Sequence, residues 1–126
     1  MDSQQLADKI SQLALEKKGH DITIMNLKKL SDVADFFVMV TCESDLHVKA
    51  IADYIETELK EAKIRVWHKE GYSNLNWVLL DFIDVVVHIF RRETRAYYAL
   101  EKLWADANIT VVKDDAPIRS VPGSTT

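Results

Sequence analysis

Cysteine and glycine are scarce in this sequence of 126 residues, and their scarcity excludes several classes of function. Cys42 is the only cysteine, so no intramolecular disulfide can form and a reducing compartment is favoured. The three glycines lie far apart, at Gly19, Gly71 and Gly123, which excludes a P-loop or a dinucleotide-binding fingerprint. The chain also lacks an apolar run that could span a bilayer and a secretory hydrophobic segment near its start. We therefore expect a cytoplasmic protein without membrane contact.

Motifs that mark common catalytic centres are missing as well. The sequence contains no Gly-x-Ser-x-Gly, no Cys-x-x-Cys and no His-Glu-x-x-His, and Cys42 follows an apolar strand as a core residue would. Asp81, Asp84 and His88 could hold a divalent metal or act as an acid/base pair. In the simpler interpretation the two aspartates flank a tight turn and His88 lies in a strand with a buried partner. We follow the simpler interpretation and expect no enzyme, no metal and no cofactor.

The charges favour a basic protein as partner. The chain has 20 acidic and 16 basic residues, a formal net charge of −4, whereas binding to a phosphate backbone depends on Lys and Arg. The densest basic cluster comprises Arg91, Arg92 and Arg95, with Tyr98 close by in the sequence. This cluster indicates either a minor contact with rRNA or a solvated helix start with ion pairs.

Hydrophobic periodicity predicts a single domain of α/β (α+β) class. The expected helices cover residues 3–18, 44–62 and 93–107, with Ser3 as the first N-cap and Gly19 just beyond the first C-terminus. The expected strands cover residues 21–27, 36–41, 64–69, 76–81 and 84–90. This order predicts a mixed five-stranded sheet with helices on one face, over residues 1–111. Residues 112–126 hold both prolines and are predicted to form a flexible tail.

Some aromatic residues fall where the predicted elements face outward. Alternation along the fourth strand puts Trp77, Leu79 and Asp81 on one face. If helices cover only the other face, this row is an apolar patch with an acidic edge, as in protein interfaces; otherwise it is core. Tyr98 lies opposite the apolar arc of the last predicted helix, which also suits an interface anchor. We assign Trp67 and Trp104 to the core.

Long segments of the chain resemble a known family. Residues 76–104, NWVLLDFIDVVVHIFRRETRAYYALEKLW, resemble the signature of the ribosomal silencing factor family, also called Iojap-like proteins. Upstream, the run HDITIMNLKKLSDVADFFVMVTCESDLHVKAIADYIE resembles the earlier half of that family, where a strand, an L-S-x-x-A-D-F-F-V run and a helix follow one another. The resemblance covers roughly residues 5 to 110.

The resemblance implies a fold and a function. It implies a nucleotidyltransferase-like fold that has lost its catalytic residues, and a repressor of translation that acts when nutrients are short. It further implies binding to ribosomal protein fourteen of the large subunit, which prevents joining of the small subunit, and a role in large-subunit biogenesis. The alternatives are a metal-dependent nucleotidyltransferase that uses Asp81 and Asp84, or an RNA-binding accessory domain that uses the arginine cluster.

Several residues match conspicuous positions of the family, and their individual roles are our hypothesis. The expected partner-binding residues are Trp77, Leu79, Asp81 and Tyr98, with Arg95 and Glu101 as a polar rim. The expected structural residues are Asp84, His88, Phe90, Leu103 and Trp104. We expect the free protein to be a monomer or a weak homodimer, because an exposed apolar row favours self-association.

Overall fold

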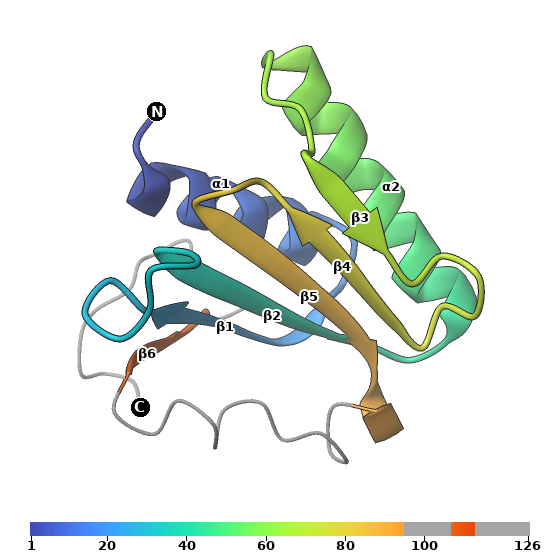
Figure 1. Cartoon of the computed structure of the whole chain (residues 1–126). Coiled ribbons are helices and arrows are strands. Elements are labelled where there is room, and N and C mark those ends of the chain that lie inside the picture. Colours follow the sequence, from blue (N-terminus) through green and yellow to red (C-terminus); the bar gives the residue numbers. More distant parts are fainter. Residues whose placement is uncertain (95–106, 113–126) are drawn as a thin grey trace.

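The computed structural model describes residues 1–94 and 107–112 of the chain (Figure 1). Its helices are α1 (Ser3–Glu16) and α2 (Asp45–Glu61). Its strands are β1 (His20–Asn26), β2 (Phe36–Cys42), β3 (His68–Glu70), β4 (Trp77–Asp81), β5 (Val85–Arg91) and β6 (Asn108–Val111). The predicted third helix falls mostly outside the described residues.

One mixed sheet contains all six strands, in the order β3-β4-β5-β2-β1-β6. Neighbouring strands are antiparallel except the central pair, β2 and β5, which is parallel. The sequence predicted five strands, and this number was wrong because β6, which pairs with β1, was not recognised. With four exposed residues, β6 is too short for a periodic pattern to stand out.

The first helix begins and ends one residue away from the predicted caps. Its N-cap is Asp2 rather than Ser3, and the Asp2 carboxylate accepts a hydrogen bond from the backbone N–H of Gln5 at 2.8 Å. At the other end Lys18, not Gly19, takes the left-handed conformation, with φ of 66°. A Cβ atom on Gly19 would lie 2.7 Å from Cγ1 of Val40, so this glycine permits close packing instead.

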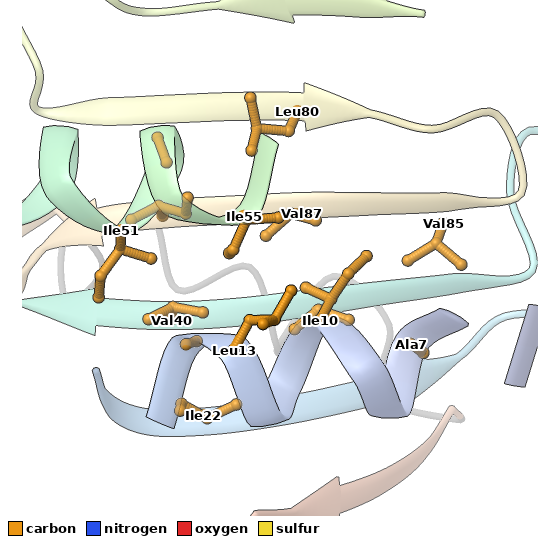
Figure 2. Packing of buried hydrophobic residues seen from close by; sticks show 14 of the residues in the cluster. Ala7, Ile10, Leu13, Ile22, Val40, Ile51, Ile55, Leu80, Val85 and Val87 are labelled. Carbon is orange, nitrogen blue, oxygen red and sulfur yellow. The ribbon is translucent and has the colours of Figure 1, made fainter. Parts of the chain in front are cut away.

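Both helices cover the same face of the sheet (Figure 1). Ser44 caps α2, and its hydroxyl accepts a hydrogen bond from the backbone N–H of His47 at 3.1 Å. One side of α2 is buried, comprising Val48, Ile51, Ala52, Ile55 and Leu59. Figure 2 shows residues of both helices meeting those of the strands in the main core. Neither described helix combines the length and the apolar composition that crossing a bilayer requires.

The opposite face of the sheet carries a second apolar cluster. Met25, Leu27, Met39 and Phe90 are fully buried there, and the partly buried side chains of Phe37, Trp77 and Ala107 pack against them. The central strand β2 is therefore buried on both faces, consistent with its unbroken run of apolar residues. This second face is the one that the candidate site uses.

The assignment of Trp67 to the core was wrong. Its side chain is 69% exposed, because it lies just before the edge strand β3, beyond which the described residues form no further strand. The backbone N–H of Trp67 donates to the carbonyl of Asp81 at 2.8 Å, which joins it to β4 through the backbone.

Candidate functional site

Three of the predicted partner-binding residues lie in one row on β4. Trp77, Leu79 and Asp81 are half-buried and alternate with the fully buried Val78 and Leu80, as the strand pattern predicted. We call Trp77, Leu79 and Asp81 the β4 row. The other three predicted residues, Arg95, Tyr98 and Glu101, lie outside the described residues.

The β4 row has a polar flank and an aromatic flank. On the edge side, Leu79 pairs with Glu70 and Asp81 pairs with His68. Nε2 of His68 lies 2.7 Å from a carboxylate oxygen of Glu70, an exposed ion pair when the histidine is protonated. On the inner side Trp77 pairs with Phe90 of β5. The row thus has an apolar centre and a polar edge, the arrangement that protein interfaces favour.

Trp77 is held by contacts from β5. Its indole Nε1–H donates a hydrogen bond to Nδ1 of His88 at 3.1 Å, and its ring centroid lies 5.1 Å from that of Phe90. The backbone of Trp77 is also packed against Gly71, where a Cβ atom would lie 2.0 Å from the Trp77 carbonyl oxygen. Gly71 has φ of 94°, which suits glycine alone. These contacts fix both the side chain and the backbone of the tryptophan.

His88 is a neutral, buried residue. Its side chain is 4% exposed, and burial lowers its pKa from 6.5 to about 4, because the cation loses its hydration. Sequence reasoning expected a buried partner for His88 but did not identify it. Side-chain alternation along the two strands allows Trp77 and His88 to share one face of the sheet. Only the register between β4 and β5 shows that the two side chains are neighbours.

Asp81 and Asp84 shape the turn between β4 and β5. The Asp81 carboxylate accepts a hydrogen bond from the backbone N–H of Ile83 at 2.7 Å. The carbonyl of Asp84 accepts from the N–H groups of Asp35 and Phe36, at 2.8 and 3.1 Å, which ties this turn to the start of β2. The bond of Asp81 fits the turn interpretation of its side chain, whereas Asp84 contributes through its backbone carbonyl.

The described residues contain no cluster suited to metal or covalent chemistry. No group of three or more His, Cys, Asp or Glu side chains among them could hold a metal ion. Cys42 is fully buried, and burial raises its pKa from 9.0 to about 12, so its thiol stays protonated at neutral pH. The prediction that Cys42 belongs to the core is confirmed.

The described part of the arginine cluster is engaged in ion pairs. Nη2 of Arg92 lies 2.7 Å from Glu43, and its Nη1 lies 3.5 Å from Asp21. Arg91 lies 3.7 Å from Glu93. A phosphate would have to compete with these carboxylates, and the pairs fit the predicted alternative of a solvated helix start with ion pairs.

Comparisons with known proteins give a consistent result. The model of a family described as "Ribosomal silencing factor during starvation" matches residues 1–125. A Halalkalibacterium halodurans protein named ribosomal silencing factor is 40% identical over 107 residues, which cover 85% of this chain and 92% of that protein. A crystal structure of a Chromobacterium violaceum protein has a TM-score of 0.81 and 31% identity, covering 93% of this chain and 98% of that one.

A more distant match comes from an organelle. A Mus musculus protein named "Mitochondrial assembly of ribosomal large subunit protein 1" is 30% identical over 100 residues. The match covers 77% of this chain and 44% of the mouse protein.

Proposed function

The chain belongs to the ribosomal silencing factor family, and from this premise we propose that it binds the large ribosomal subunit through ribosomal protein fourteen and blocks joining of the small subunit. In this proposal it acts in the cytoplasm as a repressor of translation under nutrient limitation, without catalysing a reaction. It also contributes to large-subunit biogenesis. The match of the family model over nearly the whole chain is the observation that carries the proposal. The name of the mouse relative supports the choice of the large subunit.

The β4 row is the proposed centre of the contact surface. Trp77 and Leu79 offer apolar area that is only half-buried, and Asp81 adds an acidic end. Aromatic residues in partly desolvated surroundings are the commonest energetic anchors of protein interfaces. In the proposal Tyr98 completes the anchor set, and Arg95 and Glu101 form the polar rim. The free protein is a monomer or a weak homodimer.

The charge of the chain supports a protein partner over RNA. A net charge of −4 repels a phosphate backbone and attracts a basic ribosomal protein. Arg91 and Arg92, the described members of the basic cluster, already lie beside carboxylates. Any contact with rRNA is therefore minor in this proposal.

A blocking protein of this kind acts by occupancy alone. An interface of standard size buries about 800 Å² on each partner. Nanomolar affinity corresponds to about −12 kcal/mol, which a few aromatic anchors and complementary charges can supply. Once the site on the large subunit is occupied, the small subunit has no room to dock, so no chemical step is needed.

Two tryptophan truncations test the proposed surface. Trp77→Ala should weaken binding to purified large subunits by at least about 2 kcal/mol, roughly thirtyfold in Kd, measured by co-sedimentation. Trp67→Ala is the matched control, because it removes the same side chain from an exposed position at the sheet edge. It should change Kd by less than about threefold.

Comparison of Trp77→Ala with Trp67→Ala distinguishes the loss of a specific contact from a general effect of removing a tryptophan. Circular dichroism shows whether each variant is folded before its binding is measured. Equal binding by folded Trp77→Ala and wild-type protein would show that the β4 row is not the centre of the interface. Binding to large subunits that falls steeply with salt, without binding to isolated ribosomal protein fourteen, would favour the RNA-binding alternative.

A further inference from the structure

His88 and Trp77 form a polar pair inside an otherwise apolar surface. They lie on the adjacent strands β5 and β4 (Figure 1), and the indole Nε1–H donates to Nδ1 of His88 at 3.1 Å. The surrounding rings are Phe90, 5.1 Å from the Trp77 centroid, and Phe37, 4.5 Å from the His88 centroid. This bond joins a half-exposed tryptophan to a buried histidine.

The bond determines where the proton of His88 resides. Because Nδ1 accepts the indole N–H, Nδ1 carries no proton, and the neutral imidazole must have its proton on Nε2. Nε2 is buried and has no hydrogen-bond partner among the residues that the structure describes. The ring of Phe37 offers at most a weak N–H···π contact.

An unpartnered buried Nε2–H makes His88 a poor choice for packing alone. A phenylalanine ring would fill nearly the same space without the buried Nε2–H, and it would lose the Nδ1 acceptor for the Trp77 indole. The polar interaction that His88 makes in the described structure is the one with Trp77. The hydrogen bond to the indole is thus the polar contact that favours histidine over phenylalanine at this position.

We propose that His88 is a positioning residue, which holds the Trp77 indole in the orientation that a protein partner recognises. This inference rests on the proposed function, since it assumes that Trp77 contacts the large subunit. A side chain that is already fixed loses less conformational freedom when it binds, and loss of such fixing weakens binding by about three- to tenfold. His88 does not itself touch the partner in this proposal.

Two substitutions at position 88 separate positioning from packing. His88→Phe keeps a ring but removes the acceptor, and it should weaken binding to purified large subunits by about three- to tenfold while the protein stays folded. His88→Asn places an amide oxygen near the position of Nδ1, and it should restore most of the affinity. In a Trp77→Phe background, which lacks the indole N–H, His88→Phe should have little further effect.

Imidazole nitrogen chemical shifts, measured by NMR on the wild-type protein, test the inference even if His88→Phe does not fold. Shifts that place the proton on Nε2 support it, and shifts that place the proton on Nδ1 overturn it, because Nδ1–H cannot accept from the indole. Unchanged binding by folded His88→Phe would also overturn it, as would an equal loss in the Trp77→Phe background. Wild-type protein that fails to bind large subunits would instead overturn the proposed function, and the NMR result would show whether the hydrogen bond exists.

Discussion

The turn between β4 and β5 places a branched residue in a backbone conformation that favours glycine. Ile83 has φ of 77°, and the N–H of Asp84 donates to the carbonyl of Phe82 at 3.0 Å across it, which makes a tight γ-turn. A β-branched residue at positive φ is strained, because its Cβ crowds the neighbouring carbonyl. The Ile83 side chain is 58% exposed, so little burial compensates for this strain.

Comparison of Ile83→Gly with Ile83→Ala isolates the backbone contribution. Both variants lose the isoleucine side chain, but only alanine keeps the Cβ. In an ordinary conformation glycine is less stable than alanine by about 0.5–1 kcal/mol. At positive φ the Cβ costs about 1–2 kcal/mol, which exceeds that difference and reverses the order. We expect Ile83→Gly to be more stable than Ile83→Ala by about 1 kcal/mol.

Urea unfolding of the two variants measures this difference directly. Equal slopes with a higher midpoint for Ile83→Gly would confirm that the change lies in folded-state stability. In a thermal scan the same difference corresponds to roughly 4 °C. If Ile83→Ala were as stable as Ile83→Gly or more stable, the inference that the positive φ of Ile83 strains the backbone would be contradicted.

Three other perturbations have defined outcomes. Between its unfolded pKa of 6.5 and its folded pKa of about 4, His88 binds a proton in the unfolded chain but not in the fold. The free energy of unfolding should therefore fall by up to about 3 kcal/mol as the pH drops through that window, and His88→Phe should lose this dependence in urea titrations. Gly71→Ala should destabilise the protein by about 1–3 kcal/mol, measured by thermal unfolding. Alanine is strained at the positive φ of this position, and its Cβ would collide with the Trp77 carbonyl oxygen. Calorimetric titration with magnesium and nucleotide should give no heat, whereas saturable binding would support the nucleotidyltransferase alternative.

Elements with strong periodicity could be predicted from the sequence. The helix α2 and the central strands β2 and β5 lie within one or two residues of their expected bounds, because long apolar stripes leave little choice of structure. β3 is shorter than predicted, and β6 was missed. Both are short edge strands whose pairing partners, rather than their own composition, make them strands.

The site could be predicted only in part. Alternation identified the β4 row, but the bond between Trp77 and His88 depends on the register between β4 and β5. The ion pair of Arg92 with Glu43 joins residues 49 positions apart, which no local pattern indicates. Trp67 was misplaced because hydrophobicity favours the core, whereas its position at an open sheet edge leaves it exposed.

Subunit joining in the presence of the protein tests the central claim most directly. Purified small and large ribosomal subunits are mixed with saturating protein, and whole ribosomes are quantified on sucrose gradients. The account predicts that whole ribosomes are lost and that the protein sediments with free large subunits, whereas Trp77→Ala restores joining at the same concentration. Whole ribosomes that form at an undiminished level with saturating wild-type protein would contradict it.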